Sequence, residues 1–248
     1  IPALKPAITS SPTTKYHAAL IITGHARSLA WKMVCENIKT RLVDALVRPP
    51  SRGISTNRSE LLWTLDVFLF LSLVDKDSTG HHGRLKKAYG EQMMGTCINL
   101  LKPVYVEFMP SIYQPPKMHN CTAGNEPLYI THSRKKTAAL SKAKKIRMFS
   151  MCKRLELAYD YVSRVFQSNM STRRYDAFLK ARPDVVYLKD VPFLGNYNFS
   201  GITHPAGGAD DYFQVAPRGC NLAGPRCTRC GRDRSIEANC TIYGQLNW

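Results

Sequence analysis

His17-Ala-Ala-Leu-Ile-Ile-Thr23, followed directly by Gly24, is a compact and mostly apolar run. Its length and its β-branched residues are typical of a buried strand in a parallel sheet. The chain then passes through Arg27 into residues 29–47, where apolar side chains recur every three to four positions, as they do in an amphipathic helix. A strand, a glycine-bearing turn and a helix together predict the opening of a βα unit.

The alternation of strand and helix patterns continues along the chain. Further strands are predicted at residues 66–73, 104–108 and 175–181, and further helices at residues 85–101 and 138–166. This order predicts an α/β fold with a mostly parallel, Rossmann-like sheet and helices on both of its faces.

Composition divides the 248 residues into three parts. Residues 1–16 are rich in Pro, Ser and Thr and are predicted to be a linker or stalk. Residues 17–215 carry the strand and helix patterns and form the predicted main domain. Residues 216–248 are rich in cysteine and show little periodicity, so an irregular, Cys-rich extension is expected at this end.

Two features of the sequence favour the secretory pathway, as a Golgi-lumen or a secreted protein. The eight cysteines are an even number, which suits an oxidising compartment. The second feature is a set of five Asn-x-Ser/Thr glycosylation sequons, at Asn57, Asn120, Asn169, Asn198 and Asn239. The longest apolar stretch, residues 61–74, is too short to cross a bilayer, so any membrane anchor is expected upstream of residue 1.

The chain is strongly basic, with 35 Lys and Arg residues against 18 Asp and Glu residues and a net charge of +17. Such a charge attracts polyanions, whether nucleic acid, anionic membrane, sulfated glycan or the diphosphate of a nucleotide. The sign of the charge does not choose among them. The hydrophobic content of 44% excludes a wholly disordered chain.

Ligands of open parallel sheets bind beyond the carboxyl ends of the strands. The first candidate site there is the segment from Gly24 to Ser28. Glycine permits a tight turn, backbone amides at a helix start attract anions, and the Arg27 guanidinium matches phosphate oxygens. The alternative is an ordinary glycine turn beside a solvated arginine.

The second candidate site is Arg182-Pro183-Asp184, at the end of the strand predicted over residues 175–181. Proline restricts the turn, so that Asp184 projects in a defined direction. Mg²⁺ and Mn²⁺ prefer carboxylate oxygens and bridge to substrate phosphates with few protein ligands. The alternative is an ion pair between Arg182 and Asp184 that ends the strand.

Several segments together resemble the landmarks of GT-A-type glycosyltransferases. The closest resemblance is to a poorly characterised plant, algal and viral group that has an Arg-Pro-Asp motif in place of the usual Asp-x-Asp. It covers about residues 17–215 and includes Cys152 and Glu156 in the long helix. The segments are Gly24-His-Ala-Arg-Ser28, Asp66-Val-Phe-Leu-Phe70, Tyr175-Asp-Ala-Phe-Leu-Lys-Ala-Arg-Pro-Asp-Val-Val-Tyr187 and Asp210-Asp-Tyr-Phe213.

The resemblance implies an enzyme that moves a sugar from a nucleotide-diphosphate donor to a glycan or glycoprotein acceptor. Gly24 and Arg27 would hold the nucleotide or its phosphates, with electrostatic assistance from Arg182. Asp184 would coordinate Mn²⁺ or Mg²⁺ on the donor diphosphate. The motif has one acid where two are usual, which leaves open catalysis without metal, with basic residues neutralising the leaving diphosphate.

On the acceptor side, the resemblance implies that Asp210 or Asp211 is the general base if the enzyme inverts configuration. His204 is a candidate third metal ligand, although a lone histidine in such a loop is more often merely exposed. The basic run over residues 134–154 is either a solvated helix face or a surface that grips an anionic acceptor.

A cysteine cluster near the end of the chain supports a competing interpretation. Its Cys-x-x-Cys resembles half of a zinc ribbon, and a basic zinc-ribbon protein would bind nucleic acid or another polyanion without catalysis. The sequons favour disulfides instead, and the transferase interpretation expects no nucleic-acid partner. The cluster consists of Cys220, Cys227, Cys230 and Cys240.

Overall fold

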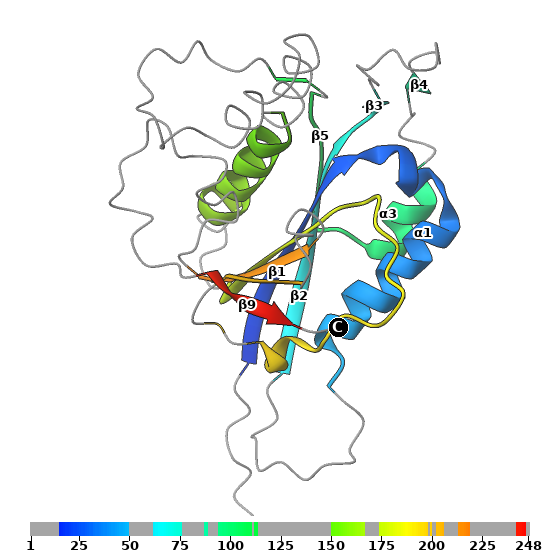
Figure 1. The fold of residues 1–248 in the computed structure, drawn as a ribbon. Coiled ribbons are helices and arrows are strands. Elements are labelled where there is room, and N and C mark those ends of the chain that lie inside the picture. Colours follow the sequence, from blue (N-terminus) through cyan, green and yellow to red (C-terminus); the bar gives the residue numbers. More distant parts are fainter. Residues whose placement is uncertain are drawn as a thin grey trace, which may run out of the picture.

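The protein has an α/β fold built on a mixed sheet (Figure 1). Seven strands lie in the order β5-β2-β1-β6-β8-β7-β9, and β3 and β4 form a separate two-stranded sheet. The computed structural model describes residues 15–49, 62–75, 87–88, 94–110, 112–113, 150–166, 174–197, 199, 202–205, 213–218 and 242–246.

The first half of the sheet is parallel, as predicted. Strand β1 (Lys15–His25) lies between β2 (Leu62–Ser72) and β6 (Ala177–Ala181), and β5 (Tyr105–Phe108) pairs with the outer side of β2. All of these pairs are parallel, so the carboxyl ends of β1, β2 and β6 meet at one edge of the sheet. The strands predicted at 17–23 and 66–73 are confirmed, and both begin before the predicted residue.

The second half of the sheet corrects the expectation of an irregular end. Strand β8 (Phe213–Pro217) is antiparallel to β6 and to β7 (Ile202–Pro205), and β9 (Ile242–Leu246) is parallel to β7. The sheet is therefore mixed, and part of residues 216–248 belongs to it. Strands of four or five residues are too short to show a clear alternation in sequence, which is why they were not predicted.

The helical segment predicted at residues 29–47 is confirmed, with changes of helix type. The 3₁₀ turn η1 (Ala26–Ala30) ends at Trp31 and is followed by helical turns as far as Val47. These later turns are α1 (Lys32–Asn37), the π-helical η2 (Ile38–Asp44) and α2 (Ala45–Val47).

The helix predicted at residues 85–101 is correct only in its second half. Helix α3 covers Gly95–Leu101, whereas β4 (Lys87–Ala88) pairs with β3 (Val74–Asp75) in an antiparallel ladder. The backbone hydrogen bonds of residues 87–88 therefore go to another strand instead of to a helical turn. No helix in the described part of the chain is long and apolar enough to cross a membrane.

Two hydrophobic cores cover the two faces of the sheet. Alternate residues of β1 divide between them, with Leu20 and Ile22 on one face and Ile21 on the other. The first face packs against α1, η2 and α3. The second packs against the helix over residues 150–160 and its π-helical continuation η4 (Tyr161–Phe166). Figure 1 shows the two sets of helices on opposite sides of the sheet, which confirms that prediction.

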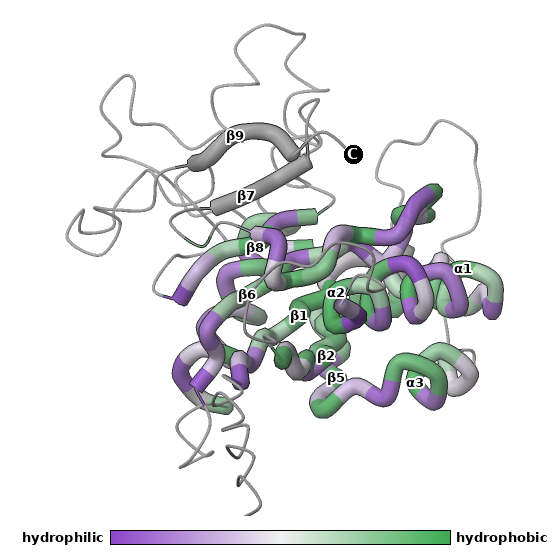
Figure 2. Tube along the Cα trace, turned by 90° about the horizontal axis from the view of Figure 1, so that it is seen from below, coloured by the Kyte–Doolittle hydropathy of each residue, from purple (hydrophilic) through white to green (hydrophobic). Residues whose placement is uncertain are grey.

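Hydropathy along the chain follows this layering. In Figure 2, β1 and β2 are mostly hydrophobic between the layers, while α1 and α3 mix hydrophobic and hydrophilic residues. This is the pattern expected of buried parallel strands covered by amphipathic helices.

A disulfide joins Cys35 on α1 to Cys97 on α3, and both side chains are fully buried. It holds together the two helices that cover the first face of the sheet. Cys152, on the opposite face, is also disulfide-bonded. Disulfides persist in oxidising compartments. The secretory location stays a prediction.

We expect the Cys35→Ala/Cys97→Ala double variant to lose about 2–4 kcal/mol of unfolding free energy, because the bond closes a long loop in the unfolded chain. The two residues are 62 positions apart in sequence. Guanidinium unfolding of the oxidised wild type and of the double variant measures the difference. If the two proteins had equal midpoints, this bond would make no contribution to stability.

Candidate functional site

The glycine turn after β1 and the Arg-Pro-Asp motif after β6 are in contact at the carboxyl edge of the sheet. A methyl group added to Gly24 would lie 2.8 Å from Cδ of Pro183, which is closer than such atoms approach in proteins. Gly24 also has a φ of +156°, a backbone conformation that other residues rarely adopt. Both the space and the backbone therefore require glycine at this position.

The Asp184 carboxylate lies between two guanidinium groups. Arg182 donates from Nε to Oδ1 at 2.8 Å and from Nη2 to Oδ2 at 2.6 Å. Nη2 of Arg27 is 3.9 Å from the same Oδ2. Burial by itself would raise the pKa of Asp184, but the hydrogen bonds and positive charge of Arg182, with a smaller contribution from Arg27, hold that pKa below its usual value.

This geometry bears on the predicted metal. Both oxygens of Asp184 accept hydrogen bonds from Arg182, so the alternative interpretation of the motif, an ion pair, is present. Within the described ranges, no group of three His, Cys, Asp or Glu side chains gathers as a metal site. A cation held by one carboxylate and by substrate phosphates needs no such group, so the assignment of Asp184 as a metal ligand stays a prediction.

Three buried hydroxyl groups belong to the residues that form this edge. Thr23 Oγ1, Ser28 Oγ and the Tyr187 hydroxyl have no hydrogen-bond partner in the described structure. Burial, and then the negative charge of nearby Asp184, raise the pKa of Tyr187. Buried polar atoms are rarely left without a partner. Thr23 lies two residues after Ile21 of the second core, whereas Tyr187 packs against the first, so these hydroxyls are polar positions on both faces of the sheet.

The segment that carries Tyr187 is fixed to the first helical layer. The Asn37 side chain donates to the Tyr187 carbonyl at 2.9 Å and accepts from its N–H at 2.8 Å. Further along, Arg41 forms an ion pair with Asp190 at 2.7 Å. In Figure 1, this yellow segment crosses the side of the sheet that carries α1 and α3. Sequence reasoning missed Asn37 because a single polar helix residue looks like an exposed one.

Two further cations are buried near this edge. Lys180 and Arg154 are only 4% and 5% exposed, respectively. Burial lowers the pKa of Arg154; the pKa is raised in part by Tyr113 and lowered further by the positive charge of Arg182. Arg154 therefore adds a buried positive charge near Arg182, which is itself paired with Asp184.

The predicted anion site after Gly24 begins with a short helical turn. This segment is η1, a single 3₁₀ turn of five residues that precedes α1. That its amide groups bind an anion stays a prediction. The other elements of the predicted site are the Gly24 turn and the half-exposed side chain of Arg27.

Several predicted site residues lie outside the described part of the chain. The backbone of His204 belongs to β7, but its side chain is outside the description. The predicted bases and the cysteines of the zinc-ribbon interpretation lie entirely outside the described residues. These are Asp210, Asp211, Cys220, Cys227, Cys230 and Cys240.

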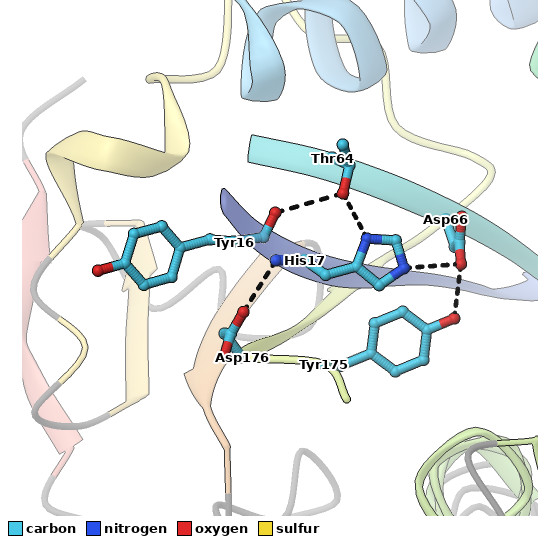
Figure 3. A network of polar contacts seen from close by, with 6 residues as sticks. All are labelled: Tyr16, His17, Thr64, Asp66, Tyr175 and Asp176. Atoms are coloured by element: carbon cyan, nitrogen blue, oxygen red, sulfur yellow. Dashed lines mark hydrogen bonds and ion pairs between the residues drawn. The ribbon is translucent and has the colours of Figure 1, made fainter. Parts of the chain in front are cut away.

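A second polar cluster, which the sequence analysis did not single out, lies where β1, β2 and β6 begin (Figure 3). His17 Nε2 is 2.9 Å from Asp66 Oδ2, and the Tyr175 hydroxyl donates to the same oxygen at 2.7 Å. His17 Nδ1 contacts the Thr64 hydroxyl, and Asp176 accepts from the His17 backbone N–H at 2.9 Å.

The hydrogen-bonded row of Asp66, His17 and Thr64 contains a carboxylate, an imidazole and a hydroxyl, the groups of a catalytic triad. Its surroundings nevertheless favour a structural role. The His17 ring stacks on Tyr175 with centroids 4.8 Å apart and is largely buried. The Thr64 hydroxyl also lies 3.3 Å from the Tyr16 carbonyl, which competes for its proton. We interpret the cluster as a clasp that joins three strands at the edge opposite to Asp184.

Comparison of this chain with protein families, with characterised proteins and with solved structures finds no significant match.

Proposed function

We propose that this chain is a glycosyltransferase of GT-A type that transfers a sugar from a nucleotide-diphosphate donor to a glycan or glycoprotein acceptor. The contact between Gly24 and Pro183 carries the proposal, because it joins two motifs that are about 160 residues apart in sequence at one edge of the sheet. That edge is where open α/β sheets bind their ligands.

The groups at this edge suit a leaving diphosphate. Arg27 and Arg182 lie beside Asp184, and both side chains are partly exposed, at 49% and 31%. Charge placed where a negative charge develops lowers the barrier to its departure. The resemblance to GT-A enzymes adds Mn²⁺ or Mg²⁺ at Asp184 as a further expectation.

An acceptor base is proposed at Asp210 or Asp211. Asp211 is two residues before Phe213 in the sequence, and Phe213 pairs with Ala181 of β6, three residues before Asp184. This connection in sequence supports the proposal. We further propose a secretory location, probed most simply by glycosylation at the sequons.

The proposal predicts that one class of nucleotide sugar raises the melting temperature of the protein and is slowly hydrolysed by it. A thermal-shift screen of uridine, guanosine and cytidine donors, with and without Mn²⁺, followed by measurement of donor hydrolysis, tests this. Arg182→Ala should reduce hydrolysis by roughly 100-fold, the size of effect seen when one transition-state donor is removed. Hydrolysis that is undiminished in this variant would exclude the proposed site.

The net charge of +17 favours a second candidate, a polyanion-binding protein without catalysis. It would be stabilised by sulfated glycan or nucleic acid, with an affinity that falls steeply as salt rises. In the same screen, this candidate predicts stabilisation by heparin or DNA and by none of the nucleotide sugars. Zinc measured in stoichiometric amount would favour the zinc-ribbon version of it.

A further inference from the structure

We propose that the donor diphosphate is bound directly by Arg27 and Arg182, and that Asp184 is a positioning residue that holds these arginines beside the Gly24 turn. Diphosphate binding then requires no divalent cation. This inference rests on the glycosyltransferase function proposed above, and it differs from the role that the Arg-Pro-Asp motif was predicted to have.

The first support is the way in which Asp184 is used. Its two oxygens accept from two different nitrogens of Arg182, at 2.8 and 2.6 Å, which is the side-by-side geometry of a strong arginine–carboxylate pair. Arg182 is thus oriented by this pair, while its side chain stays 31% exposed.

A cation bound by Asp184 would have to displace these hydrogen bonds. It would also place a doubly charged ion next to Arg182 and near Arg27, whose Nη2 is 3.9 Å from the carboxylate. Like charges at such distances repel strongly in a partly buried site. A ligand that brings negative charge to the arginines meets neither obstacle.

The second support is the chemistry of the residues next to the Arg182–Asp184 pair. The Tyr187 hydroxyl is buried, lies near enough to Asp184 for that charge to act on it, and lacks a partner in the described structure. Arg154 is buried close enough to Arg182 for their charges to interact. The oxygens of a diphosphate accept hydrogen bonds and carry negative charge, so they complement a hydroxyl donor and the guanidinium groups.

Calorimetric titration of the full chain with inorganic pyrophosphate, UDP and GDP tests the inference, first in EDTA and then in excess Mn²⁺. We expect pyrophosphate and one nucleotide to bind in EDTA, and excess Mn²⁺, which itself complexes diphosphates, not to make the binding tighter. Arg27→Ala and Arg182→Ala should each weaken binding by roughly 10- to 100-fold, the effect of removing one hydrogen-bonded charge. Binding that appears only with Mn²⁺ would overturn the inference.

Asp184→Ala separates positioning from simple electrostatics. Removing a negative charge should by itself strengthen the binding of an anion, whereas losing the anchor of Arg182 should weaken it. We expect weaker binding of pyrophosphate, with Asp184→Asn in between because its carbonyl can still accept from Arg182. Tighter binding by Asp184→Ala would contradict the positioning role.

The pair of Arg41 and Asp190 provides the matched control. It is also an arginine–aspartate ion pair, at 2.7 Å, and both side chains are about half exposed. Arg41→Ala should leave pyrophosphate binding unchanged. If Arg182→Ala does not fold, as judged by circular dichroism, Arg27→Lys serves instead. Arg27 is 49% exposed, and lysine keeps the aliphatic part of its side chain.

The inference and the proposed function can fail separately. Pyrophosphate binding in EDTA without hydrolysis of any nucleotide sugar would leave the arginine site in place and remove the transferase. Hydrolysis that depends strictly on Mn²⁺, with no binding in EDTA, would support the transferase and reject the arginine site.

Discussion

Gly24→Ala is expected to lower the free energy of unfolding by about 1–3 kcal/mol, the usual cost of a forced backbone conformation or an overpacked contact. The added methyl would meet Cδ of Pro183 at 2.8 Å, and the residue would keep a φ of +156°. Chemical denaturation of the variant and the wild type measures the loss.

The same substitution should have a larger effect on the proposed reaction. Relief of the clash moves Pro183, and with it Arg182 and Asp184, away from the turn. A misplacement of about 1 Å in a catalytic group can cost about 100-fold in rate. We therefore expect donor hydrolysis by Gly24→Ala to fall about 100-fold under conditions in which the variant is folded.

Gly95 provides the control for this prediction. It is the first residue of α3, and a methyl added there would meet nothing within 4 Å. Gly95→Ala should be neutral or slightly stabilising, since alanine favours helix by up to about 1 kcal/mol over glycine. If the two variants lost stability and activity equally, the contact between Gly24 and Pro183 would have no special role.

Asp66→Ala should cost more stability than any other change in the clasp at the opposite edge. It removes the acceptor shared by His17 Nε2 and the Tyr175 hydroxyl. Each buried group left without a partner costs roughly 1–3 kcal/mol. Thermal and denaturant unfolding should therefore show a larger loss for this variant than for Tyr175→Phe, which removes one donor and leaves Asp66 paired with His17.

The clasp variants also separate structure from function. Because the clasp lies at the amino ends of the strands, Tyr175→Phe should bind pyrophosphate as the wild type does while it remains folded. A clasp variant that is fully stable but loses donor hydrolysis would show that the Asp66–His17–Thr64 chain takes part in the reaction.

The parallel half of the sheet was predictable because its buried strands are long apolar runs. Eleven consecutive residue pairs join β1 to β2, and such strands stand out in a sequence. Strands β7, β8 and β9 were not predictable, because each has only four or five residues. The antiparallel pairs of β8 also need no helix in the connection, so no strand–helix alternation marks them in the sequence.

The site was predictable in position but only partly in detail. The rule that ligands bind at the carboxyl edge correctly brought the segment from Gly24 to Arg27 next to Asp184. The orientation of Asp184 toward Arg182 was one of two open alternatives, because spacing in sequence does not decide which partner a carboxylate takes. The contact between Asn37 and the backbone of Tyr187 was not predicted, because the two residues are 150 positions apart.

A structure of the protein with a bound nucleoside diphosphate tests the central claim most directly. The account predicts that both phosphate groups lie at the Gly24 turn, within hydrogen-bond distance of the Arg27 and Arg182 guanidinium groups. Phosphates bound elsewhere on the chain, with the pair of Arg182 and Asp184 untouched and no ligand beside it, would contradict it.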